Sequence, residues 1–432
     1  MLTALTGSAC QFASSPQPQP APEPRPSLAL PPDPLVAVDG RAIDSATAWR
    51  TVRRPEILEL FRRHMYGRAP VQNSLTVEDA AEEIALDGLA RRKQWRIRYG
   101  EQEGAFFDVL MYAPAGSEVP APAFLGLNFF GNQTIHADPG IRMPSSWVRN
   151  DKRIGVAHNR PLPRSRGARS SRWPVEEILA RGYALITVYY GDIDPDFDDG
   201  FQNGVHGVYD ARDQGERAED AWGSITAWAW GLSRVLDTLQ HEPAIDATRV
   251  AVLGHSRLGK TSLWAGARDE RFAMVISNDS GCGGAAYSRR RAGETVKVIN
   301  RVFPHWFCTA FHAYGDREDH LPIDQHLLIA AIAPRPAYVA SAAKDAWADP
   351  EGEFLSTLGA SPVYQLLGTE GLPTDTMPDI DHPVHGQLGY HVRAGKHDLT
   401  WQDWQHYLEF ADRHLAGDAA RSVTGATSRP TK

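Results

Sequence analysis

The chain has 432 residues, and 45 Lys and Arg against 53 Asp and Glu give a formal net charge of −8. This acidic balance excludes a general nucleic-acid binder, whose binding face needs an excess of basic residues. No stretch reaches about 18 consecutive apolar residues, which excludes a transmembrane helix. The three cysteines provide neither a disulfide framework nor the CxxC pairs of a zinc cluster, so we expect neither to organise the fold.

The first 34 residues are predicted to be a signal remnant or a disordered tether. Prolines alternate with other residues from 16 to 26, a pattern that favours extended polyproline II structure. Ser8-Ala9-Cys10 resembles the end of a lipoprotein signal, although Gly7 stands where an aliphatic residue is expected. Two interpretations of the N-terminus therefore remain: lipid anchoring through Cys10, or a disordered or misassigned start. Residues 417–432 are small and polar, and we predict a disordered tail.

Residues 35–416 show the pattern of a single α/β domain. Near-continuous apolar runs of strand length are typical of buried parallel strands. They occur at 123–129, 183–190, 250–253, 274–277 and 337–340. Segments 221–240 and 401–415 have the apolar spacing of helices. Alternating strands and helices predict a mostly parallel, doubly wound sheet in a three-layer αβα sandwich, with ligands at the carboxyl ends of the strands.

A long loop between the first two of these strands is strongly basic. Between residues 142 and 172 it contains one acid, Asp151, and the following basic residues: Arg142, Arg149, Lys152, Arg153, Arg160, Arg164, Arg166, Arg169 and Arg172. The segment 192–199 that follows is acidic. The two segments are either solvated loops that offset each other's charge, or the basic loop is a rim that meets an acidic polysaccharide.

The segment 250–264, VAVLGHSRLGKTSLW, allows two interpretations. It matches the phosphate-binding pattern GxxxxGK[ST], with Lys260 and Thr261 facing nucleotide phosphates and magnesium. Bulky residues in the loop interior disfavour this interpretation, since backbone amides must close around a phosphate there. Alternatively, Ser256 stands on the sharp strand-to-helix turn of a nucleophile elbow. A serine before a helix is more commonly an N-cap, so the motif alone does not decide.

A nucleophile elbow requires an acid and a histidine further along the chain. His397 follows a strand-like YHVR segment and precedes the helical pattern at 401–415. Two acids lie between Ser256 and this histidine, namely Asp279 at the end of one apolar run and Asp345 shortly after the next. Both are candidates for the acid of a serine triad.

Several motifs in one order resemble the bacterial glucuronoyl esterases, carbohydrate esterase family fifteen. They read GHSRLGKTSLWAGA, SNDSGCGGAA, RAGET, FPHWF, DQHLLIAAIAPRP, AKDAWADP and RAGKHDLTWQDW. The resemblance is strong over residues 221–415 and looser over 35–190. It implies an α/β-hydrolase fold and hydrolysis of the ester between 4-O-methyl-glucuronic acid of xylan and a lignin alcohol, without metal or organic cofactor.

The resemblance also implies a role for each matching residue. Ser256 would be the nucleophile and His397 its base. The family often has a glutamate where this chain has Asp279, whereas the general α/β-hydrolase order favours Asp345, which we place slightly ahead. Arg257 would stabilise the oxyanion with its backbone N–H and its guanidinium.

Further matches concern the uronate sugar. The resemblance implies that Lys260, Glu294 and Trp347 hold it, the first two through its hydroxyl groups and the indole through its apolar face. His305 and Trp306 in FPHWF are interpreted as buried residues in the wall of the site and not as catalytic residues. Whether Cys282 and Cys308 pair stays open.

Two other functions remain as alternatives. One is a different carbohydrate esterase, such as an acetyl xylan esterase, and the other is a non-catalytic carbohydrate-binding protein. The expected partner is a glucuronoxylan or lignin-carbohydrate ester, and we expect a monomer. Because a plant-wall polymer cannot enter a cell, we expect a secreted or periplasmic protein.

Overall fold

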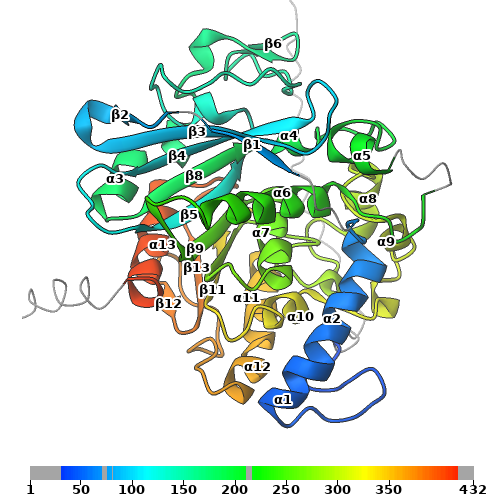
Figure 1. Ribbon diagram of the computed structural model, residues 1–432. Helices are drawn as coiled ribbons and strands as arrows, with labels where there is room; N and C mark the ends of the chain where they lie inside the picture. Colours follow the sequence, from blue (N-terminus) through cyan, green and yellow to red (C-terminus); the bar gives the residue numbers. More distant parts are fainter. Residues whose placement is uncertain (1–30, 71–74, 80, 211–216, 417–432) are drawn as a thin grey trace, which may run out of the picture.

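The computed structural model describes residues 31–70, 75–79, 81–210 and 217–416 (Figure 1). Its centre is a sheet in the order β1-β3-β4-β8-β5-β9-β10-β11-β13-β12, with β2 paired to β3. The strands of this sheet are Thr76–Glu78 (β1), Glu83–Ala85 (β2), Ala90–Arg98 (β3), Phe106–Pro114 (β4), Ala121–Asn128 (β5), Ala184–Tyr189 (β8), Ile245–His255 (β9), Met274–Asn278 (β10), Ala337–Ala342 (β11), Val384–His385 (β12) and Leu388–Arg393 (β13).

The five apolar runs identified in the sequence form β5, β8, β9, β10 and β11, so those predictions are confirmed. Together with β13 these strands pair with one another in parallel. Strands β1 to β4 and β12 extend the sheet on its two sides with antiparallel pairs. The sequence analysis identified none of these edge strands. Strands β1, β2 and β3 mix charged and apolar residues, so they have no continuous apolar run. Strand β4 differs, because residues 109–113 (VLMYA) form a buried apolar run that was not predicted to be a strand.

Helices cover both faces of the sheet, which confirms the predicted three-layer sandwich. Figure 1 shows α3 and α13 on one side and α6 and α7 on the other. Along β9, Val250 and Val252 belong to one core, and Ala251 and Leu253 to the other. The helices are Ala46–Ala48 (α1), Arg54–Phe61 (α2), Val175–Ala180 (α3), Tyr190–Ile193 (α4), Gly204–Tyr209 (α5), Ser224–Leu239 (α6), Arg257–Arg268 (α7), Val296–Val302 (α8), Thr309–His312 (α9), Gln325–Ala330 (α10), Pro350–Gly359 (α11), Ser361–Leu366 (α12) and Trp401–His414 (α13).

Both helices that the sequence predicted are present, as α6 and α13. Helix α13 begins with a capping box, in which Thr400 and Asp403 each accept a hydrogen bond from the other's backbone N–H. Such a box satisfies two N–H groups that otherwise have no partner at a helix start. It therefore fixes where α13 begins, directly after the loop that contains His397.

The two chain ends and Cys10 lie outside the described residues. At the end of the predicted tether, Arg53 donates to the carbonyl oxygens of Asp33 and Pro34, and His326 Nε2 lies 2.7 Å from that of Pro32. No helix in the described part of the chain has both the length and the apolar character needed to cross a bilayer. Cys282 and Cys308 are buried free thiols, so they do not pair.

The basic loop folds into short turns and a small hairpin of Val156–Ala157 (β6) and Arg160–Pro161 (β7). Arg166 donates to the carbonyl oxygens of Asp138 and Ile141, and Arg172 forms an ion pair with Asp398. In the acidic segment, Asp196 forms an ion pair with Arg257 of α7 and not with an arginine of this loop. Arg166 therefore holds the loop to the segment just before it, and Arg172 attaches it to the His397 region.

Replacing Trp404 by alanine tests how far the core beneath α13 stabilises the fold. The Trp404 side chain is fully buried against Phe124 and Trp173, and its indole N–H donates to the Arg172 carbonyl. We expect a loss of about 3–5 kcal/mol in the free energy of unfolding, measured by urea denaturation. Trp401→Ala is the matched control on the same helix. Trp401 is 42% exposed, so its loss should cost about 0.5 kcal/mol or less.

Candidate active site

Ser256 occupies a single-residue turn between β9 and α7. Its φ of 60° and ψ of −128° are strained for a residue with a side chain. Its backbone N–H donates to the Asn278 carbonyl at 2.8 Å, which anchors the turn to β10. Although Ser256 is at the N-cap position, its side chain makes no capping hydrogen bond. The hydroxyl group is therefore free for another role, as the nucleophile-elbow interpretation expects.

The glycines of the turn explain why it departs from the GxSxG pattern. A Cβ on Gly254 would lie 1.8 Å from the Leu258 carbonyl oxygen, so only glycine fits there. Leu258 occupies the place of the usual second glycine, and its side chain is buried in the core. The required small residue is instead Gly259, where a Cβ would lie 3.0 Å from the Ser280 side chain. The close approach to β10 has moved along the helix by one residue.

A tight turn of this kind does not fit a phosphate-binding loop. Helix α7 already begins at Arg257, so no flexible loop of free amides separates β9 from Lys260. The Thr261 hydroxyl donates to the Arg257 carbonyl inside the helix at 2.9 Å. The nucleotide interpretation of this segment is therefore wrong.

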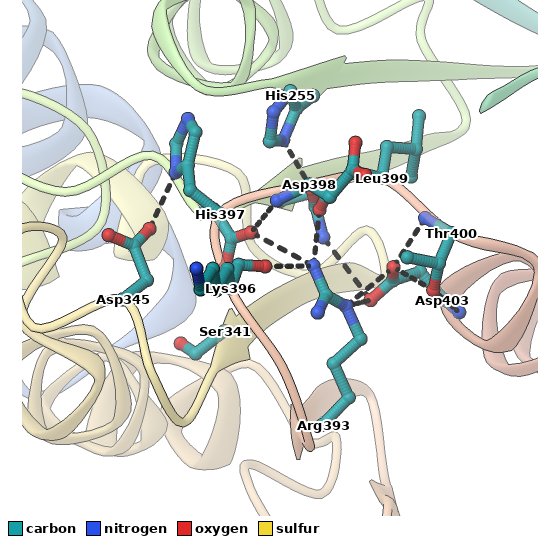
Figure 2. Close-up of polar contacts among 12 residues, drawn as sticks. His255, Ser341, Asp345, Arg393, Lys396, His397, Asp398, Leu399, Thr400 and Asp403 are labelled. Carbon is teal, nitrogen blue, oxygen red and sulfur yellow. Dashed lines mark hydrogen bonds and ion pairs between the residues drawn. The ribbon is translucent and has the colours of Figure 1, made fainter.

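His397 lies on the loop between β13 and α13, and Arg393 holds that loop from below (Figure 2). The buried guanidinium donates to the carbonyl oxygens of Lys396 at 3.0 Å and Asp398 at 2.5 Å, on either side of the histidine. It also forms a double hydrogen bond with Asp403 at the start of α13, at 2.8 and 3.0 Å. The loop is thus tied to the end of one strand and to the beginning of the next helix.

Asp345 and Asp279 both lie beside His397, but in different ways. Asp345 Oδ2 is 2.5 Å from His397 Nδ1 (Figure 2). Asp279 Oδ2 accepts instead from Arg393 at 3.3 Å and from the Asp398 backbone N–H at 3.2 Å. Burial raises the pKa of Asp279 well above its usual value, and nearby Glu353 adds to the shift. A neutral carboxyl group would support the loop without balancing the charge of an imidazolium.

These three side chains are also the right types to hold a metal ion. One ligand atom from each of Asp279, Asp345 and His397 lies within 4.8 Å of the others. However, the histidine is already paired with Asp345, and Arg393 places a positive charge on Asp279. The arrangement is better suited to moving a proton than to binding a cation.

Arg257 is held beside Ser256 by a buried carboxylate. Its guanidinium donates to Asp196, whose side chain is 3% exposed. The same carboxylate accepts hydrogen bonds from Tyr190 at 2.8 Å, His305 at 3.0 Å and Trp306 at 2.7 Å. These donors and the arginine hold the pKa of Asp196 far below its usual value despite burial. The resulting ion pair fixes a positive charge at the turn that contains Ser256.

One cavity of about 350 Å³ brings together all eight residues singled out in the sequence. Small-molecule pockets generally measure about 300–1,000 Å³, so this volume suits a single sugar residue. The lining residues are Ser256, Arg257, Lys260, Asp279, Ser280, Gly281, Glu294, Phe303, Trp306, Asp345, Trp347, Ala348 and His397. We call this space the acyl pocket.

The candidate sugar-binding residues surround the part of the acyl pocket beyond Ser256. Lys260 Nζ donates to the carbonyl oxygens of Ser280 and Cys282, and lies 3.9 Å from Glu294. An ammonium group has three N–H donors, so one remains for a ligand. Trp347 is 56% exposed at the pocket, and its carbonyl oxygen accepts from the Glu294 backbone N–H at 2.9 Å.

A second hollow of about 190 Å³ lies on the other side of Ser256, and we call it the outer pocket. Ser256, Arg257 and His397 line both spaces. The remaining walls of the outer pocket are aromatic and basic side chains, namely Phe129, Phe130, Tyr190, His255, Arg149, Arg169 and Arg172. The basic loop thus contributes directly to the rim of the site.

Known proteins resemble this chain over most of its length. A family model for fungal glucuronyl esterases matches residues 179–368. Carbohydrate esterase MZ0003, from an unknown prokaryotic organism, is 53% identical over 390 residues, which cover 90% of each chain. A 4-O-methyl-glucuronoyl methylesterase of Schizophyllum commune is 34% identical over 350 residues, 78% of this chain and 73% of the relative.

Solved structures give the same result. A promiscuous CE15 esterase from a marine bacterial metagenome is 52% identical with a TM-score of 0.85, covering 89% of this chain and 97% of its own. A glucuronoyl esterase from Solibacter usitatus is 45% identical with a TM-score of 0.85, covering 91% and 99%. The chain belongs to the CE15 glucuronoyl esterases. It is therefore a carboxylic ester hydrolase with the α/β-hydrolase fold, as the sequence motifs predicted.

The sequence analysis of this CE15 esterase missed three buried charged residues. Asp196 was counted only as part of a solvated acidic segment, and Arg393 only as part of a strand. Glu353 was not noticed, although it accepts from the backbone N–H groups of Ser280 and Gly281, which line the acyl pocket. Burial raises the pKa of Glu353 to about 7. For Asp196 a signal existed, since it follows the carboxyl end of β8, where ligands of such sheets collect.

Exchanging each acid for its amide distinguishes the partner of His397. Asp345→Asn should lower kcat for a glucuronate ester by about 10³–10⁴-fold, because the imidazole loses the carboxylate that orients it. Asp279→Asn should lower kcat by roughly tenfold or less, because an amide oxygen can still accept from Arg393 and from the Asp398 N–H as the neutral carboxyl group does. The reverse ranking of the two kcat values would assign the role to Asp279.

Asp196→Asn tests whether this carboxylate positions Arg257. A hydrogen bond to a charged group contributes about 1.5–3 kcal/mol, so we expect kcat to fall about 10- to 100-fold with a small change in KM. Asp198→Asn is the control on the same loop, where Asp198 accepts only a weak 3.4 Å bond from Gly200 N–H among the described contacts. Equal kcat values for the two variants would show that Asp196 has no such role.

Proposed function

We propose that the chain hydrolyses the ester between (4-O-methyl-)glucuronic acid of xylan and lignin alcohols through an acyl-enzyme on Ser256. The observation that carries this proposal is the acyl pocket, in which nucleophile, base, acid, guanidinium and sugar-binding candidates face one space. Family membership supports the ester chemistry. The residue roles below follow from the geometry of the site.

In the first step, His397 removes the proton of the Ser256 hydroxyl as the oxygen attacks the ester carbonyl. Asp345 keeps the imidazole oriented and balances its positive charge. The backbone N–H of Arg257, the first of helix α7, has no partner inside the helix and faces the developing oxyanion together with the guanidinium. Such preorganised donors are typically worth about 3–4 kcal/mol each. His397 then protonates the departing alcohol, leaving an ester on Ser256.

In the second step, His397 takes a proton from water, and the hydroxide attacks the acyl carbonyl. Collapse of this intermediate breaks the bond to Ser256 Oγ, which regains a proton from His397. The product is free uronate. Its carboxylate remains beside Arg257, so the residue that stabilises the oxyanion also slows release of the product.

The two pockets support a substrate that lies with one half on each side of Ser256. Lys260 and Glu294 offer a donor and an acceptor for hydroxyl groups, and the Trp347 indole offers a flat face to a pyranose. The outer pocket, with Phe129, Phe130 and Tyr190, suits an aromatic alcohol. Its arginines support the earlier interpretation of a rim that meets an acidic polysaccharide.

Acetyl xylan esterase activity is the second candidate function. An acetyl group would leave the sugar-binding part of the acyl pocket unused, which disfavours it as the main substrate. A non-catalytic carbohydrate-binding protein would have no need of the strained Ser256 or of the Asp345 and His397 pair. We further propose that the enzyme is a monomer that acts outside the cytoplasm, because its polymer substrate cannot enter a cell.

Two substrates and one variant test the proposed reaction. The purified protein should hydrolyse a methyl ester of glucuronic acid with a higher kcat/KM than an acetylated xylose. Ser256→Ala should lower kcat by about 10⁴-fold or more and still bind glucuronate in calorimetry. Faster turnover of the acetylated sugar would favour the second candidate, and full activity of Ser256→Ala would exclude the acyl-enzyme.

A further variant and its control test the sugar-binding part of the acyl pocket. Glu294→Gln weakens an acceptor for a sugar hydroxyl and should raise KM for the glucuronate ester about tenfold, with little effect on the acetylated substrate. Glu370→Gln, at an exposed position away from the pocket, should change neither value. Equal effects on both substrates would contradict a sugar-specific role for Glu294.

A further inference from the structure

Two histidines at the edge of the sheet have ring nitrogens that are not used by the fold. His385 lies on β12, and His406 lies on α13. The ring nitrogens of both residues are buried, and none of the four has a hydrogen-bond partner within the described residues. Burying a polar group without a partner is costly, typically about 1–3 kcal/mol. Two such imidazoles side by side therefore indicate a ligand that both can reach.

Glu409, one turn after His406 on α13, completes a group of three. Its Oε2 lies 3.9 Å from His406 Nδ1 and 4.0 Å from His385 Nε2. One ligand atom from each of the three side chains lies within 4.8 Å of the others. Zinc ligands at about 2.0–2.1 Å and tetrahedral angles stand roughly 3.3 Å apart. The ligand atoms would therefore have to approach one another by about 1.5 Å or less, and the Glu409 side chain, which is 50% exposed, is free to move.

We propose that His385, His406 and Glu409 form a binding site for a divalent transition metal ion such as Zn²⁺. Two imidazoles and a carboxylate are a ligand set that zinc takes in proteins, with a fourth position for water. The cysteine count excludes a thiolate cluster but says nothing about such a set. The half-exposed glutamate leaves an access route from solvent, while the histidine rings lie against the core.

Burial and charge at the site suit a divalent cation. Imidazoles bind a metal in their neutral form, and the His385 and His406 side chains are 8% and 14% exposed. Glu409 supplies a negative charge for the cation.

The neighbouring histidine His391 is not one of the proposed metal ligands, because both of its ring nitrogens have other hydrogen-bond partners. Its ring is 4.7 Å from that of His406, but its Nε2 pairs with Asp403 at 2.9 Å and its Nδ1 with the Tyr338 hydroxyl. Asp403 in turn holds Arg393, which supports the loop of His397. A metal ion at the proposed site would join β12 to α13 and stabilise the helix on which this support depends.

The test uses the full chain, freed of metal by a chelator. Zn²⁺ alone should bind in a one-to-one ratio in calorimetry and raise the unfolding temperature by several degrees, because a ligand of the folded state stabilises it. Co²⁺ should give the intense visible absorption of a four-coordinate site. Both effects should disappear in His385→Gln and in His406→Gln, whereas His382→Gln, an exposed neighbour, should behave as the unchanged protein.

A second arm separates this site from the active site, where Asp279, Asp345 and His397 could also take a metal. His397→Ala should retain the one-to-one binding and the thermal shift. Without metal, the His385 and His406 variants should unfold at nearly the same temperature as the unchanged protein, since the lost nitrogens made no hydrogen bonds. Metal binding that survives both glutamine variants, or that His397→Ala abolishes, would overturn the proposal.

Discussion

The buried guanidinium of Arg393 is the interaction on which the catalytic arrangement depends. It reaches the carboxylates of Asp279 and Asp403 and the backbone carbonyls on both sides of His397. A loop of small and polar residues would otherwise have no rigid shape of its own. Because one planar group with several N–H donors satisfies all of these acceptors, the loop takes a single conformation. The position of the imidazole is thus set from beneath by a residue that never contacts substrate.

A comparable arrangement exists on the other side of Ser256. There a buried carboxylate, Asp196, collects hydrogen bonds from Tyr190, His305 and Trp306 and fixes the guanidinium of Arg257. The first network is centred on a positively charged group, Arg393, and the second on a negatively charged group, Asp196. Between them stands the strained turn at Ser256, which the strand β9 and the helix α7 hold in place. Each of the groups that would handle charge in the proposed reaction is therefore held in place by the fold itself.

Much of this site could be predicted because its residues belong to motifs with a fixed order. Ser256, Asp345 and His397 follow strand ends, and apolar runs identified most of those strands. Arg393 and Glu353 could not be found in that way, because their importance lies in which partners the fold brings to them. A charged residue in a strand or acidic loop looks the same in sequence whether it faces water or a buried partner. The antiparallel strands β1 to β3 were missed for a related reason, since strands with an exposed face lack a continuous apolar run.

The separation of Ser256 from its base along the chain has a consequence for biosynthesis. The strand and helix that shape the turn at Ser256 can pack as soon as β10 has formed. His397 acquires its orientation only after Asp403 and the first turn of α13 have been made, because Arg393 needs both to be held. A ribosome-bound chain that has not reached this helix lacks the support that orients His397, the proposed base. Hydrolytic competence therefore arises at a late point in translation, after most of the sheet has been synthesised.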